Sequence, residues 1–355
     1  MGKWIALLLL LVTAPTFAQA PTTSEVLAAA VNQVIRPGLA EFKSRASGLE
    51  SALGGLCAVP SAMALEIAQQ QFGMAATAYG RVEFLRVGPL MEDNRVDRLL
   101  FFPDRKGIGL RQVQAILADQ DASATDVGTL RQKSVAVQGF GALEFVLFGT
   151  DFETLQTADG AFRCRFGQTI AHNVSNMADE LAMGWYRYDG VASHLTRPVP
   201  ENADYRTETE AMEELVGLVS HGLEAVRDTR INPFIAQGDA AAKPKQALFW
   251  RSGLTMAMIA ANLEGMEKLV AVSGVARAVP ETESGLDNSI AFEFANAKRA
   301  LALVTLPVEQ AVADEKQVAA LNYLVIVTQS LQAQIGEQLA FALGLSVGFS
   351  SLDGD

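Results

Sequence analysis

The fold class is indicated most clearly by one stretch, residues 138–149, which reads QGFGALEFVLFG. Glu144 is the only ionisable residue between Phe140 and Phe148. A helix that is apolar on every side is a buried helix, so this stretch predicts a helix in the protein interior. The Glu144 carboxylate would be buried with it, and a buried carboxylate must pair, bind a cation or take up a proton. Glu144 is therefore the first candidate for a functional residue.

The rest of the chain favours an all-α protein. Ala, Leu, Glu and Gln recur, whereas the Val/Ile/Thr alternation typical of strands is rare. Half of the 355 residues are hydrophobic, which is ample for a core, and the length suits two domains of ordinary size. We expect two helical-bundle domains packed side by side, residues 21–189 and 207–355, joined by a Pro-containing linker at 190–206.

Helical periodicity and end signals give the expected elements. In the first half we expect helices at 23–56 with a bend at Pro37, and at 61–87, 109–119, 125–148 and 161–188. In the second half an apolar stripe over 215–226 predicts a helix, and further helices follow at 254–272, 283–304 and 307–343. Residues 88–107 lose the helical period, and we expect a packed loop of the kind that often carries function.

The first twenty residues resemble a secretory signal peptide. Lys3 gives the positive start, residues 5–12 the apolar core, and Ala18-Gln19-Ala20 the small-residue cleavage site. The apolar core is too short to span a membrane, and no cysteine follows the cleavage site to take a lipid anchor. We expect an exported, periplasmic protein that has no transmembrane segment once the signal is removed.

Net charge limits the classes of expected partner, and the cysteine and histidine content limits the expected covalent and metal chemistry. The net charge of −12 disfavours nucleic acid, so a small ligand or a periplasmic or membrane protein is the expected partner. An oxidising compartment favours a disulfide between the two cysteines, Cys57 and Cys164. The three histidines lie far apart, and the chain has no zinc-ligand spacing, phosphate-binding loop or serine-hydrolase elbow. These observations predict no catalytic residues, no metal ligands and no cofactor, with a bound metal ion kept open as an alternative.

Several segments resemble the imelysin-like (peptidase M75-like) family, which has a Gly-x-His-x-x-Glu motif on a buried helix. Gly139 and Glu144 match the ends of this motif, but Gly141 stands at the histidine position. Further similar segments, in the family's order, are 81–89, 102–112, 163–173, 249–254 and 261–265. The resemblance implies two bundle-like helical domains with a site at their interface. It also implies a link to bacterial iron uptake, with peptidase activity in some members.

Charged and small residues in these segments are the candidate ligand-binding residues. They are Glu83, Arg86, Asp104, Arg105, Gly139, Gly141, Glu144, Arg251, Ser252 and Asn262. Because a guanidinium binds a carboxylate at two points, we expect Arg86, Arg105 or Arg251 to hold Glu144. Simpler readings stay open: a local Glu83–Arg86 pair, a plain charged turn at Asp104–Arg105, and a helix cap at Ser252.

Three functions are compatible with this pattern. A metallopeptidase usually needs three protein ligands and an activated water, and Gly141 removes the family's histidine. We therefore expect a non-enzymatic periplasmic binding or accessory protein linked to iron or metal uptake. The alternatives are an imelysin-type peptidase and a structural or protein-partner module with a buried Glu–Arg network.

Overall fold

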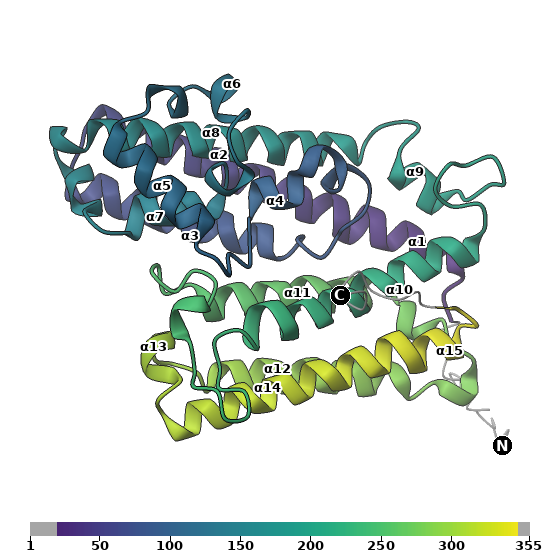
Figure 1. Cartoon of the computed structure of the whole chain (residues 1–355). Helices are drawn as coiled ribbons and strands as arrows, with labels where there is room; N and C mark the ends of the chain where they lie inside the picture. Colours follow the sequence, from purple (N-terminus) through teal and green to yellow (C-terminus); the bar gives the residue numbers. More distant parts are fainter. Residues whose placement is uncertain (1–19, 347–355) are drawn as a thin grey trace, which may run out of the picture.

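The computed structural model describes residues 20–346, so the expected signal peptide, except its last residue, lies outside the described residues. Within 20–346 the chain forms helices and turns with no strand. The all-α prediction is confirmed. Figure 1 shows the helices of the first half above those of the second half, with the long axes of most helices running in similar directions.

The first half is built around a long helical rod. It consists of α1 (Thr23–Ala29), the π-helical turn η1 (Ala30–Ile35) and α2 (Arg36–Ala58). Thr22 begins the rod with a capping box closed by Glu25. Pro37, where a bend was expected, lies in the first turn of α2, directly after the π-helical turn. The rod packs along α3 (Ala62–Gly80) and α8 (Ala161–Gly184).

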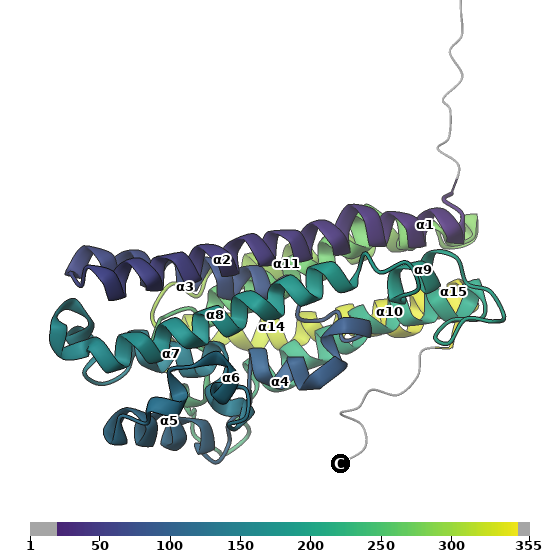
Figure 2. The same ribbon diagram turned by 90° about the horizontal axis from the view of Figure 1, so that it is seen from above.

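Smaller helices lie at one edge of this group, as Figure 2 shows. They are α4 (Arg95–Leu99), α5 (Ile108–Asp119), α6 (Val127–Leu130) and α7 (Phe140–Phe148). The single helix expected over 125–148 is therefore wrong, because α6, the 3-10 turn η5 (Val135–Val137) and α7 take its place. Gly139 explains the last break: a Cβ there would lie 2.2 Å from the Leu99 carbonyl oxygen, so the chain passes too close to α4 for any side chain.

The second half is a four-helix arrangement. Its helices are α10 (Glu208–Ala225) with the π-helical turn η8 (Val226–Ile231), α11 (Thr255–Ser273), α12 (Leu286–Ala302) and α14 (Glu315–Ala333). The terminal helix expected over 307–343 is interrupted, because α13 (Val308–Ala311) ends and Asp314 caps a new helix. After α14 the chain continues through η12 (Gln334–Leu339) into α15 (Ala340–Ala342).

One stretch of this half, Glu315–Ala342, has the length and apolar composition of a membrane span. Core helices of soluble proteins meet the same criteria, and α14 packs against α10 and α12. The expectation of no membrane span therefore stays a prediction.

The segment expected to be a linker has structure of its own. Residues 191–196 form α9 (Val191–Thr196), which packs on α1 and α10. Val191, Ala192 and Leu195 are buried. The His194 ring nitrogens each lie 2.8 Å from a carboxylate oxygen, one of Asp189 and one of Asp204. These hydrogen bonds, first the one with Asp189, raise the pKa of His194.

The two halves meet along a close helix crossing. The N-terminal end of the rod and α3 both pack on α11, and the buried side chains of both halves form one continuous core. At the crossing a Cβ on Gly265 would lie 2.0 Å from the Arg81 carbonyl oxygen at the end of α3. Only a glycine allows the two backbones to approach this closely. The division into two independently folded domains stays a prediction.

The crossing predicts opposite effects for two helical glycines. Gly265→Ala forces α3 and α11 apart, and we expect it to lower the free energy of unfolding by about 1–3 kcal/mol. Gly55→Ala in α2 meets nothing within 4 Å and should raise stability by about 0.5–1 kcal/mol, because alanine favours the helix. Urea unfolding of both variants decides it. Equal behaviour of the two would contradict the close crossing.

The predicted disulfide is confirmed. Cys57 at the end of α2 and Cys164 in α8 are bonded, with their Cα atoms 5.5 Å apart. The bond closes a loop across a sequence separation of 107 residues and ties two long helices of the first half together.

Because this loop is long, removal of the bond should release much chain entropy into the unfolded state. We expect the Cys57→Ala/Cys164→Ala double variant to lose about 4–5 kcal/mol of unfolding free energy on the chain-entropy account. Guanidinium unfolding of this variant and of reduced native protein gives the measurement. A loss of unfolding free energy below about 1 kcal/mol in both proteins would contradict a stabilising role for the Cys57–Cys164 bond.

Candidate functional site

The site is built around Glu144, which lies near the middle of α7 and is only 4% exposed. The backbone N–H and the hydroxyl group of Ser252 each lie 3.0 Å from its Oε1 and donate to it. Arg251 Nη1 lies 4.0 Å from Oε2. The predicted burial is therefore found, but Ser252 from the other half makes the hydrogen bonds. Of the three expected arginines, only Arg251 approaches Glu144, and at the limit of an ion pair.

Burial has the largest influence on the pKa of this carboxyl group. Loss of water around Glu144 raises its pKa, and this effect exceeds the opposing effects of Ser252 and the Arg251 charge. The Ser252 hydroxyl is also 3.1 Å from the Phe249 carbonyl oxygen. It can therefore donate to Phe249 and accept a hydrogen bond from the hydroxyl of a neutral Glu144, so the contact suits either protonation state. The expectation that an arginine keeps Glu144 ionised is not supported.

Glu144 opens onto a cavity of about 630 Å³. Its walls come from α5, α7, the loop 100–107 and the segment 228–251, so both halves contribute. Five of the candidate residues line it: Asp104, Arg105, Gly141, Glu144 and Arg251. Aromatic and lysine side chains that were not among the candidates share the lining, chiefly Phe102, Phe145, Trp250, Lys243 and Lys245. The aromatic residues lie in the segments 102–112, 138–149 and 249–254 that the sequence had singled out, whereas nothing in the sequence pointed to the two lysines.

The two glycines of the motif have different roles. Gly139 is required by the close approach of its backbone to α4 and does not line the cavity. Gly141 lines the cavity, and a Cβ added there meets nothing within 4 Å. No packing constraint therefore demands glycine at 141, and a side chain at this position has open space around its first carbon.

Asp104 and Arg105 take separate roles in the wall. The Asp104 carboxylate accepts hydrogen bonds from the backbone N–H groups of Ile108, Gly109 and Leu110, so it caps the start of α5. Arg105 is exposed at the cavity and forms no ion pair with a described residue. Asp104 is thus a structural cap, and Arg105 is available to a ligand.

Three candidate residues line a different cavity of about 280 Å³: Glu83, Arg86 and Asn262. Glu83 is buried and pairs with Arg230 of η8, so the local Glu83–Arg86 pair that the sequence left open is not formed. Asn262 Nδ2 donates to Glu83 Oε2 at 3.0 Å and to the Gly80 carbonyl oxygen at 2.8 Å. Arg86 is exposed, so the prediction that it turns inward to Glu144 is wrong. Arg230 was missed because nothing in its local sequence shows a partner 147 residues away.

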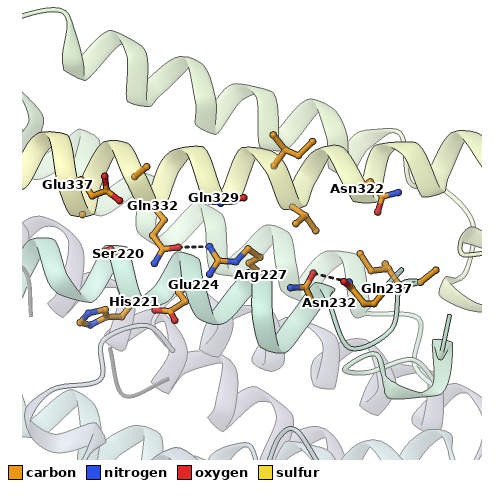
Figure 3. A pocket seen from close by; sticks show the side chains of 16 residues that line it. Ser220, His221, Glu224, Arg227, Asn232, Gln237, Asn322, Gln329, Gln332 and Glu337 are labelled. Carbon is orange, nitrogen blue, oxygen red and sulfur yellow. Dashed lines mark hydrogen bonds between the residues drawn. The ribbon is translucent and has the colours of Figure 1, made fainter. Parts of the chain in front are cut away.

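A third, open groove of about 900 Å³ runs between α10–η8 and α14–η12. Figure 3 shows its polar side chains engaged with one another: Arg227 with Gln332, and Gln237 with Asn232. None of the candidate residues lines this groove. Its wall is rich in side-chain amides and also contains Glu224, Arg227 and Glu337.

Residues 20–346 contain no group of three His, Cys, Asp or Glu side chains that could hold a metal ion. His172 lies 2.5 Å from Glu50 on the surface, and His194 lies between its two aspartates. Neither histidine lines the Glu144 cavity.

The raised pKa of Glu144 gives a pH-dependent prediction. The folded protein binds this proton more tightly than the unfolded chain, so unfolding free energy falls as pH rises through the folded pKa. Glu144→Gln keeps an acceptor for Ser252 and removes this fall. We expect it to lie within about 1 kcal/mol of the native protein at acidic pH and to gain on it towards pH 8.

Urea unfolding across pH 5–8.5 makes this measurement, with Glu41→Gln on the surface of α2 as the control that leaves the slope unchanged. A uniform loss of about 3–5 kcal/mol in Glu144→Gln would instead mean that an ionised carboxylate is paired with Arg251.

Comparison with known proteins agrees with this architecture. The family model described as imelysin matches residues 35–338. An imelysin-like protein from Psychrobacter arcticum 273-4 superposes with a TM-score of 0.76 at 19% identity, over 94% of this chain and 99% of that one. A protein from Parabacteroides distasonis ATCC 8503, assigned as an iron-regulated protein A precursor, gives 0.67 at 14% identity, over 89% and 96%. No curated protein matches the sequence. The chain therefore belongs to the imelysin family.

Proposed function

We propose that this protein is a non-enzymatic binding protein of the cell envelope, linked to iron uptake, that holds a small ligand in the Glu144 cavity. One observation carries the proposal: Gly141, at the motif's histidine position, opens onto the cavity beside a carboxylate already bonded by Ser252. The cavity volume lies within the range of small-molecule sites.

Gly141 at the histidine position of the motif also disfavours the peptidase alternative. A zinc-type peptidase uses three protein ligands and an open position for water. Glu144 has no His, Cys, Asp or Glu pair gathered beside it among the described residues. Its raised pKa further weakens it as a ligand, because metal binding requires the ionised form.

Two further observations support location and pathway. The Cys57–Cys164 disulfide suits an oxidising compartment, as does the signal-like sequence of residues 1–20. A structurally similar protein is assigned as an iron-regulated protein A precursor, which motivates the link to iron. Cell fractionation and N-terminal sequencing test the export, with Pro21 as the expected first residue of the mature chain.

Metal titration tests the central claim. We expect the native protein to bind ferrous, ferric and zinc ions no tighter than millimolar in calorimetry. Gly141→His places an imidazole in the open space near Glu144, and we expect measurable zinc affinity from it, abolished again in Gly141→His/Glu144→Gln.

A native protein that binds iron or zinc at micromolar concentration, and loses this on Glu144→Gln, would overturn the proposal. So would cleavage of a fluorescent casein substrate that stops on Glu144→Gln. Gly55→Ala, far from the motif in α2, serves as the control for both assays.

A further inference from the structure

We infer that the Glu144 cavity binds an organic anion with a flat apolar body, whose acidic group is held by Arg251. This inference rests on the proposed binding function and names the chemical class of its ligand.

The cavity carries positive charge that the protein does not neutralise. Arg105, Lys243, Lys245 and Arg251 line it, in a chain whose net charge is −12. Arg105, Lys243 and Lys245 form no ion pair with any residue of the described range. Four cations around one cavity, three of them without an ion pair, give it a local positive potential that favours an anion.

The carboxylates in the same lining are already committed. Asp104 caps α5, and Glu144 accepts from Ser252. Asp228 pairs with Arg227 and accepts from Asn232 Nδ2 at 2.9 Å. The cations therefore face the cavity without an equal set of available acids, and the site favours a ligand of negative charge.

Arg251 is positioned to bind an acidic group at two points. Its guanidinium carbon lies 4.4 Å from the centre of the Trp250 ring and 5.5 Å from that of Phe145. Among the described residues its only polar contact is Glu144 Oε2 at 4.0 Å, which is too long for a hydrogen bond. The rings thus hold the guanidinium without using its N–H donors, so little ordering is left for a ligand to impose.

The walls around these cations are apolar and partly aromatic. They include Phe102, Pro103, Leu110, Phe145 and Trp250. Lys245 Nζ lies 5.4 Å from the centre of the Trp250 ring. Such walls exclude a bare inorganic ion as the best ligand, because they contribute only when an apolar body covers them. The open space at Gly141 extends the room beside this wall.

Three matched probes test the inference in calorimetry on the full mature chain: 1-naphthoate, its neutral amide 1-naphthamide, and the cation 1-naphthylmethylamine. We expect naphthoate to bind at least tenfold tighter than the amide, and the amine to bind weakest. Sulfate alone should compete at least tenfold more weakly than naphthoate. Lys268→Gln, an exposed lysine of α11 outside the cavity, controls for loss of one positive charge.

Arg251→Gln should remove most of the preference for naphthoate and leave the affinity of the amide unchanged. A residual preference below about threefold can come from Arg105, Lys243 and Lys245, which remain in this variant. Arg251→Lys should recover only part of the loss, because a lysine cannot make the two-point contact. The Lys243→Gln/Lys245→Gln double variant, which changes only exposed side chains, should weaken naphthoate by several-fold and keep the fold.

The outcomes separate the two proposals. Equal binding of naphthoate and amide, an undiminished preference in Arg251→Gln, or tightest binding of the amine overturns the anion inference and leaves the binding function standing. Sulfate that competes as well as naphthoate overturns the apolar body. If none of the three naphthalene probes binds at millimolar concentration, the inference about the ligand class falls, while the proposed function is decided separately by the metal titration and the cleavage assay.

Discussion

The buried ion pair of Glu83 and Arg230 joins the two halves of the chain at the end of α3. Glu83 follows α3, Arg230 lies in η8, and Asn262 of α11 donates to the same carboxylate. A buried pair adds little net stability over an apolar contact, yet removal of one partner leaves a charge without water or counterion. The pair therefore works as a constraint on geometry. It fixes the end of α3 against the second half, next to the close crossing at Gly265, and so sets the distance between the walls of the cavity.

The wall of the Glu144 cavity that comes from the second half is positioned by the turn at Phe249. Phe249 has a left-handed backbone, with φ of 57°, and its ring packs at 5.4 Å from that of Phe72. A bulky residue keeps such a conformation only where its surroundings hold it. This turn directs Trp250, Arg251 and Ser252 towards α7. The aromatic core of the first half thus places the polar residues that the second half contributes to the site.

Local patterns were sufficient for some of this and insufficient for the rest. The apolar run around Glu144 predicted its burial, and export logic predicted the Cys57–Cys164 bond. The first depends on residues within one helix, and the second on the signal-like start of the chain and its two cysteines. The partner of Glu83 could not be predicted, because Arg230 is brought to it by tertiary packing across 147 residues. The break at Gly139 was missed for the same reason, since its cause is a carbonyl group of α4. The candidate residues also divide between two cavities, because Glu83 and Glu144 belong to elements that face different sides of the junction.

A cluster of cations inside an acidic chain has a kinetic consequence. The net charge acts over a distance of about 30 Å at 0.01 M salt but only about 8 Å at physiological ionic strength. In dilute salt an approaching anion meets the repulsion of the whole surface before it reaches Arg105 or Lys245. Physiological salt removes that outer barrier, while contacts inside the partly enclosed cavity are screened less. The rate of association should therefore rise as salt is first added, whereas encounters steered by complementary net charge slow down.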